Sequence, residues 1–152
     1  MTDFYDELNK KLSALLEGER HKIANLANAA ALLFHSLSEV NWAGFYTLEN
    51  GGLVLSCFQG NVACVRIPLG RGVCGTAAAA DKTQVVRDVN EFAGHIACDA
   101  ASQSEIVVPL HNVSGAVVGV LDIDSAKLAR FGEDDQQGLE AAAKIIEQSI
   151  DW

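Results

Sequence analysis

The sequence lacks any excess of positive charge. Its 11 lysines and arginines stand against 20 aspartates and glutamates, and the formal net charge is −9. Binding to nucleic acid or to an anionic membrane needs a basic surface that neutralises phosphates, and none is visible. We therefore expect neither nucleic acid nor a membrane as a partner. Solubility alone explains the acidity.

A long apolar run and a secretory leader are also missing. No stretch reaches the roughly 18–20 consecutive apolar residues of a membrane-spanning helix. Residues 1–7 carry neither a basic segment nor an apolar one, so a signal peptide is not indicated. These absences predict a cytoplasmic protein. In a reducing cytosol its four cysteines are poor candidates for permanent disulfides.

Two common cysteine patterns do not occur. No pair has the C-x-x-C spacing of a dithiol motif, and none has the short spacing of a zinc knuckle. His95 precedes Cys98 by three residues, which resembles a ligand spacing but is a weak signal alone. We therefore predict no metal site and no bound cofactor.

The chain has enough apolar residues for one sizeable core. Hydrophobic residues make up 49% of its 152 positions, which predicts a single domain over residues 1–152. Helical spacing at the start predicts a helix capped by Asp3, with Phe4, Leu8, Leu12 and Leu15 on its apolar face. A second helix is expected over residues 23–37 and a last one from about residue 133 onward.

Between these helices the apolar pattern changes to the alternation of strands. It predicts strands at residues 42–47, 53–58, 65–67, 83–86, 105–110 and 116–123, with a short helix at residues 73–80. Residues 88–102 show no clear periodicity and are interpreted as a functional loop. This order predicts an α+β fold: a central antiparallel sheet of about six strands with the N- and C-terminal helices packed on one face.

The apolar faces of the two N-terminal helices fit two roles. They can cover the sheet, or they can join two chains. We favour the second role and predict a homodimer.

Three acidic residues are expected to meet on one face of the sheet. Side chains alternate along a strand, so Asp122 and Asp124 project to the same side, and Glu105 approaches them if the two last strands pair. Carboxylates brought together raise at least one pKa and keep a protonated acid near neutral pH. The alternative for both aspartates is a strand-end turn or a solvated charge, but the apolar residues 117–121 before them indicate burial.

Two aromatic residues share a face of the first strand. Trp42, Gly44 and Tyr46 point the same way, and the missing side chain of Gly44 suggests a slot for a small ligand. An ordinary pair of core aromatics is an equally good interpretation.

The cysteines divide into a structural one and a group with chemical potential. Cys57 lies in an apolar strand and is interpreted as a buried thiol. Cys98 lies in the irregular stretch near His95, whose cation would lower a thiol pKa from its free value of about 8.5, while Asp99 would act in the opposite direction. One active cysteine suits acyl or phosphoryl transfer. Several converging cysteines suit redox chemistry, because an oxidised sulfur needs a resolving thiol.

Motifs along nearly the whole chain belong to one recognisable set. They are N-W-A-G-F-Y (41–46), F-Q-G (58–60), A-C-V-R-I-P (63–68), G-R-G-V-C-G-T-A (70–77), T-Q-V-V-R-D-V (83–89), G-H-I-A-C-D-A-A-S-Q-S-E-I-V-V-P (94–109) and G-V-L-D-I-D-S (119–125). Together they resemble the free methionine-(R)-sulfoxide reductases, which are GAF-domain enzymes. The resemblance implies a GAF fold, reduction of the free amino acid methionine-(R)-sulfoxide, and recycling by thioredoxin.

The resemblance also implies roles for the thiols. Cys98 matches the nucleophile, Cys64 the main resolving cysteine and Cys74 an additional one. Cys57 has no counterpart. The implied cycle passes through a sulfenic acid on Cys98 and a disulfide that thioredoxin reduces.

The remaining matches concern the pocket. Trp42 and Tyr46 match the pocket aromatics, and Glu105, Asp122 and Asp124 match the acidic substrate-binding groups. Two alternatives stay open at this stage: a GAF sensor that binds a small molecule, and a thiol sensor that registers oxidants without turnover.

Overall fold

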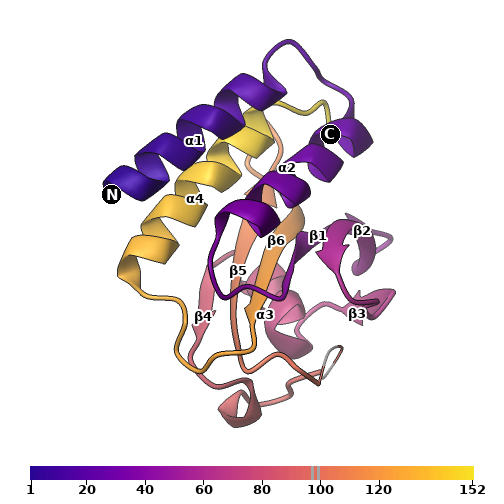
Figure 1. Cartoon of the computed structure of the whole chain (residues 1–152). Helices are drawn as coiled ribbons and strands as arrows, with labels where there is room; N and C mark the ends of the chain where they lie inside the picture. Colours follow the sequence, from indigo (N-terminus) through magenta and orange to yellow (C-terminus); the bar gives the residue numbers. More distant parts are fainter. Residues whose placement is uncertain (97, 99) are drawn as a thin grey trace.

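The computed structural model describes residues 1–96, 98 and 100–152, and within them six strands form one antiparallel sheet in the order β3-β2-β1-β6-β5-β4 (Figure 1). The strands are β1 (Trp42–Glu49), β2 (Gly52–Gly60), β3 (Arg66–Pro68), β4 (Gln84–Val86), β5 (Ser104–His111) and β6 (Val117–Ser125). The predicted α+β architecture is confirmed. Because β6 pairs with both β1 and β5, the first hairpin and the last strands join into one surface.

Three of the helices lie on one face of this sheet, as predicted (Figure 1). The helices are α1 (Asp3–Leu16), α2 (Lys22–Ser36), α3 (Gly72–Ala80), the 3₁₀ helix η1 (Val89–Glu91) and α4 (Glu133–Gln148). The chain's main core forms where α1, α2 and α4 pack against the inward side chains of β1, β5 and β6. Of the helices within the described residues, none has both the length and the apolar character that crossing a bilayer requires.

The predicted apolar face of α1 is wrong by one position at both ends. Phe4 and Leu15 are 49% and 43% exposed, whereas Tyr5 and Leu16 are buried. The ring of Tyr5 packs directly over Gly138 of α4, where an added Cβ would lie 2.1 Å from its Cγ. Periodicity alone does not choose between neighbouring apolar residues. Packing of α1 against α4 decides which of the neighbouring residues is buried, and this packing is a tertiary contact that periodicity does not reveal.

The start of α1 is also shifted by one residue. Thr2, rather than Asp3, is the N-cap, and its hydroxyl accepts a hydrogen bond from the backbone N–H of Tyr5 at 3.4 Å. Asp3 stands in the first turn, where its charge favours the helix dipole. The apolar face of α1 packs on α4 and α2, and that of α2 packs on β1 and β2. Contacts within one chain therefore account for both faces, and the homodimer stays a prediction.

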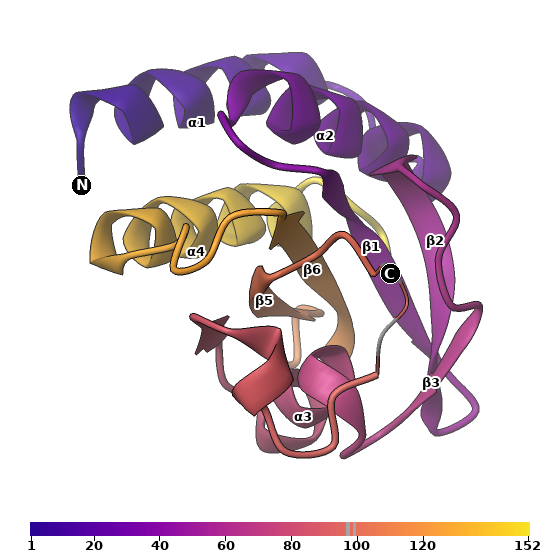
Figure 2. The same cartoon turned by 60° about the horizontal axis from the view of Figure 1, so that its bottom comes forward.

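The opposite face of the sheet is covered by α3 and by the segment around η1 (Figure 2). A second apolar cluster forms there, in which Val73 and Ala77 of α3 pack with outward-facing residues of the sheet such as Val107 and Val120. The sheet is therefore a layer between two different environments. One side holds the large helical core, and the other holds a smaller core that contains the predicted site residues.

The strand register brings the predicted acidic residues together. Glu105 of β5 lies opposite Asp124 of β6, and Val107 lies opposite Asp122. On the other side of β6, Trp42 lies opposite Asp124. The alternation that placed Asp122 and Asp124 on one face is thereby confirmed, and so is the approach of Glu105.

The slot predicted over Gly44 is not open. Gly44 pairs with Phe58 of β2, and an added Cβ on Gly44 would lie 2.3 Å from the Cβ of Phe58 and 2.9 Å from the backbone oxygen of Cys57. The Phe58 ring stacks on Trp42 with a centroid distance of 5.1 Å. Gly44 therefore serves the close approach of β2, and β2 fills the space that the sequence pattern suggested for a ligand.

Substituting Gly44 by alanine should destabilise the protein by about 1–3 kcal/mol, because the methyl group overlaps backbone that cannot easily move. Gly52 in the same hairpin is the control: its nearest neighbour is 3.7 Å from an added Cβ. Gly52→Ala should change the free energy of unfolding by less than about 0.5 kcal/mol. Chemical denaturation of both variants tests this, and equal effects would contradict the packing described.

Candidate active site

A cavity of about 40 Å³ lies between the sheet, α3 and the segment that carries Cys98. Seven of the eight predicted site residues line it: Trp42, Tyr46, Cys74, Cys98, Glu105, Asp122 and Asp124. The eighth, Cys64, is covalently joined to this set. The sequence-based prediction that these side chains converge is confirmed.

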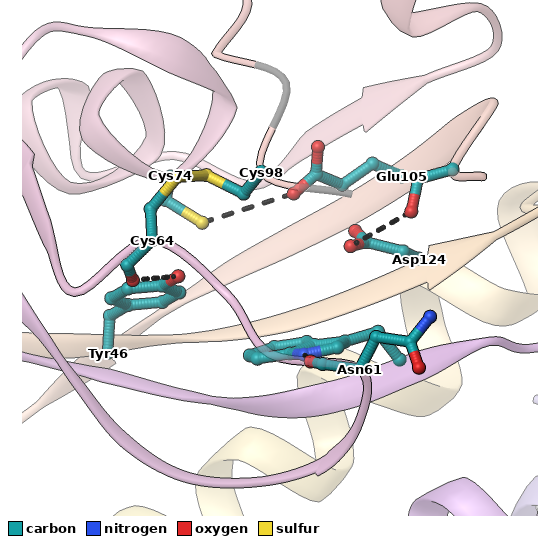
Figure 3. Close-up of a disulfide and its surroundings, with 9 residues drawn as sticks. Tyr46, Asn61, Cys64, Cys74, Cys98, Glu105 and Asp124 are labelled. Carbon is teal, nitrogen blue, oxygen red and sulfur yellow. Dashed lines mark hydrogen bonds between the residues drawn. A yellow bond between two sulfur atoms is a disulfide. The ribbon is translucent and has the colours of Figure 1, made fainter. Parts of the chain in front are cut away.

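A disulfide joins Cys64 to Cys98 across 34 residues of sequence (Figure 3). Cys64 lies in the connection between β2 and β3, and Cys98 follows η1. From the sequence, no permanent disulfide is expected. This bond agrees with that expectation only if it forms and is reduced during function. The joined pair is the one that the family resemblance implies.

The other two cysteines are free thiols in very different places. Cys57 is half-buried in β2, and its Sγ lies 3.6 Å from the backbone oxygen of Ile23 in α2, away from the cavity. Cys74, in the first turn of α3, is buried and lines the cavity. Cys57 is interpreted from sequence as a buried thiol, whereas the structure leaves it half-buried and outside the cavity lining.

The two aromatic residues of β1 hold the loop that carries Cys64. The hydroxyl of Tyr46 donates a hydrogen bond to the backbone oxygen of Cys64 at 2.8 Å, as Figure 3 shows. Trp42 donates from Nε1 to the backbone oxygen of Asn61 at 3.0 Å. Burial, followed by the charge of Asp122, raises the pKa of Tyr46, so its hydroxyl stays protonated and remains a donor. Sequence reasoning missed this anchoring role because backbone acceptors carry no residue signature.

The acidic residues form a cluster without a cationic partner. Glu105 and Asp122 are only 8% and 5% exposed, and no lysine or arginine stands among the described residues that line the cavity. Burial first, and then the charges of Asp122 and Asp124, raise the pKa of Glu105 well above its ordinary value. Burial and the charge of Asp122 also raise the pKa of Asp124. At least one acid of the cluster is therefore protonated near neutral pH.

Hydrogen bonds satisfy only part of this cluster. Ser102 donates to Oδ2 of Asp124 at 3.4 Å, and Sγ of Cys74 makes a long contact of 4.0 Å with Oε2 of Glu105. Oδ1 of Asp122 and Oδ1 of Asp124 are buried and accept no hydrogen bond from the described residues. Buried acceptors of this kind are costly, so they require a proton shared within the cluster or a donor from a ligand. Ser102 is a site residue that the sequence patterns did not reveal.

Cys74 is held as a thiol by its surroundings. Burial, and then the negative charges of Asp122 and Glu105, raise its pKa well above the ordinary value. Sγ of Cys74 and one oxygen each of Glu105 and Asp122 lie within 4.8 Å of one another, a geometry that a small cation also satisfies. The absence of a metal stays a prediction.

His95 does not behave as the sequence suggested. Burial lowers its pKa, so it is neutral near pH 7 and supplies no cation to lower the pKa of Cys98. Asp99, the other proposed influence, lies outside the described residues. The N-terminus of α3, which is the positive end of that helix's dipole, lies at the site, because its first residues Gly72 and Val73 line the cavity. The dipole of that helix favours an anion there, such as a thiolate or a carboxylate.

The raised pKa of Glu105 has a measurable consequence for stability. In the unfolded chain its carboxyl has a pKa of about 4.3, whereas the folded protein holds the proton to higher pH. Because the folded state binds more protons, the stability of the wild type falls as pH rises above the unfolded value. Glu105→Gln has no such proton, so its stability relative to the wild type should increase from pH 5 to pH 8. Thermal denaturation at both pH values measures this.

The exposed Glu91, substituted in the same way, is the control for Glu105→Gln. A stability difference between Glu105→Gln and the wild type that does not change with pH would show that this carboxyl is not protonated in the folded protein.

Comparison with known proteins assigns a family to this geometry. The GAF domain model matches residues 21–151. The free methionine-R-sulfoxide reductase of Escherichia coli K12 is 54% identical, over 98% of this chain and 90% of the relative. The structure of fRMsr of Staphylococcus aureus in its reduced form superposes with a TM-score of 0.93 at 52% identity, covering 95% of this chain and 94% of the other.

A further solved structure holds a ligand. Free methionine-R-sulfoxide reductase from Neisseria meningitidis, determined in complex with its substrate, has a TM-score of 0.92 and 46% identity, with 95% and 87% of the two chains covered. The fold and the overall sequence thus point to the same family. This chain belongs to the free methionine-R-sulfoxide reductase family of GAF-domain proteins.

Proposed function

We propose that this protein reduces free methionine-(R)-S-oxide to methionine with its own thiols. The observation that carries the proposal is the position of Cys98: it lines the same cavity as the acid cluster and is disulfide-bonded to Cys64. The enzyme names of the relatives support the same reaction. Trp42, Tyr46, Glu105, Asp122 and Asp124 are proposed as substrate-binding residues.

The unsatisfied acceptors match the groups of a free amino acid. A substrate ammonium would donate to Oδ1 of Asp122 and of Asp124, which lack donors among the described residues. The methyl sulfoxide end would lie against the aromatic rings of Trp42 and Tyr46. An enclosed site also accounts for the preference for a free amino acid, because the flanking backbone of a peptide has no room to enter.

The chemistry begins at Cys98. Its thiolate attacks the sulfoxide sulfur, and an acid of the cluster protonates the oxygen, which ends on Cys98 as a sulfenic acid while methionine leaves. The Cys64 thiol then attacks the sulfenic sulfur, and water departs as the disulfide forms. The two thiols have lost two electrons, and thioredoxin returns them by reducing the disulfide. The structure with a joined Cys64–Cys98 pair corresponds to the end of this sequence.

We assign the first resolving step to Cys64 rather than to Cys74. Cys74 is buried, and burial with the neighbouring carboxylates raises its pKa, so it is a weak nucleophile near neutral pH. Its contact with Glu105 suits a thiol that helps to position the proton-donating acid. Cys74 remains available as an additional resolving thiol.

Turnover with a racemic substrate tests the proposal. Reduced protein, free methionine sulfoxide and dithiothreitol should consume the R epimer and leave the S epimer unchanged. Cys98→Ser should lower the rate on the order of 10⁴-fold or more, because it removes the nucleophile. Cys57→Ser is the matched control and should retain the wild-type rate, since Cys57 lies away from the cavity. A wild-type protein that consumes neither epimer would favour the sensor alternatives.

A further inference from the structure

Cys64 lies in a segment of the sequence that has no acidic residues. Residues 50–80 contain no aspartate or glutamate, although the whole chain carries 20 of them, and they contain two arginines, Arg66 and Arg71. Both arginines are exposed. Residues 50–80 therefore carry a formal charge of +2 on a protein whose formal net charge is −9.

The same segment also exposes apolar side chains. Val62 and Val65, on either side of Cys64, are 86% and 61% exposed, and Leu69 is 39% exposed. These are three of the nine large apolar residues that are exposed within the described part of the chain. Exposed apolar side chains on both sides of a reactive group, with two arginines in the same segment, are typical of a protein interaction site.

The backbone of this segment is held in a defined conformation. Arg71 donates from its backbone N–H to the oxygen of Pro68 at 3.1 Å, and Gly70 donates to the oxygen of Gly75 at 2.8 Å. An added Cβ on Gly75 would lie 2.3 Å from the oxygen of Pro68, so the segment packs tightly on the start of α3. A surface that is already ordered loses little conformational entropy when a partner binds.

The two sulfurs of the disulfide differ in what they face. Cys98 lines the substrate cavity, whereas Cys64 is not among the described residues that line it. Cys64 is half-buried between the exposed Val62 and Val65. Figure 3 shows Cys64 above Tyr46, and the hydroxyl of Tyr46 holds its backbone. A molecule in the cavity therefore lies next to Cys98, whereas the exposed valines flank Cys64.

We propose that residues 62–71 form the docking surface for an acidic protein dithiol, and that this partner attacks Sγ of Cys64 rather than Sγ of Cys98. The partner would carry apolar surface around its reactive thiol, matching the valines, and acidic groups opposite Arg66 and Arg71. This inference rests on the proposed function, because the docked partner would be the reductant that each cycle of the proposed reaction needs.

The exchange balances as follows. The partner's thiolate forms a bond to Sγ of Cys64, the Cys64–Cys98 bond breaks, and Cys98 leaves as a thiolate into the cavity where the next substrate binds. The partner's second thiolate then attacks the partner's first sulfur, which is bonded to Cys64 in the mixed disulfide. This attack releases the Cys64 thiolate. The partner loses two electrons and becomes a disulfide, the enzyme gains them, and the two thiol protons of the partner pass to the enzyme's thiolates or to solvent.

The docking surface is tested by measuring how fast thioredoxin, used as the protein dithiol, reduces the oxidised protein. In the double variant Val62→Asp/Val65→Asp the second-order rate constant should fall about tenfold or more, because unpaired carboxylates would be buried against an acidic partner. Reduction of the same variant by dithiothreitol should stay within about twofold of the wild type. Val113→Asp is the control, since Val113 is fully exposed in the turn between β5 and β6.

Trapping identifies the attacked sulfur. A thioredoxin whose second active-site cysteine is replaced by serine should form a stable mixed disulfide with the oxidised wild-type protein, and peptide mass spectrometry should place the bond on Cys64. A bond on Cys98 would overturn the proposal. So would an equal rate constant for the double variant and the wild type, or a wild-type disulfide that dithiothreitol reduces and thioredoxin does not. None of these readouts uses methionine sulfoxide, so failure of the proposed turnover remains a separate result.

Discussion

The pairing of β6 with both β1 and β5 is the constraint on which the site depends. It places Asp124 opposite Glu105 on one side and opposite Trp42 on the other, although these residues are far apart in sequence. A shift of one residue in this register would turn both aspartates toward the helical core and the apolar Ile123 toward the cavity. The apolar side chains that β6 buries against α1, α2 and α4 exclude that shift. The fold thus fixes the acid cluster through its hydrophobic core.

The arrangement concentrates negative charge where the chain offers no counter-charge. The raised pKa values of Glu105 and Asp124 show that the folded protein bears a free-energy cost for ionising these groups. In the mechanism we propose, the same cost would be useful, because it would keep an acid protonated in the cavity that Cys98 lines and would leave acceptors for a cationic substrate group. Enzymes commonly have active-site residues that lower the stability of the fold and are needed for activity.

Much of this was accessible from the sequence, for identifiable reasons. Strand alternation has a period of two, so the shared face of Asp122 and Asp124 followed from their spacing, and the approach of Glu105 needed only the pairing of β5 with β6. Packing partners were not accessible: Phe58 fills the space over Gly44. Burial was not accessible either, and it lowers the pKa of His95, which disfavours the cation considered beside Cys98. The Cys64–Cys98 pairing came from resemblance alone, since spacing leaves several pairings open.

The central claim is that Cys98 reacts with the substrate and that Cys64 resolves the product. A single turnover measures this directly: the fully reduced protein is mixed with one equivalent of free methionine-(R)-S-oxide and no external reductant, then quenched with a thiol-alkylating reagent. The account predicts one equivalent of methionine, a disulfide between Cys64 and Cys98, and alkylation of Cys57 and Cys74. Methionine formed together with a disulfide that includes Cys74, or formed with no loss of thiols, would contradict it.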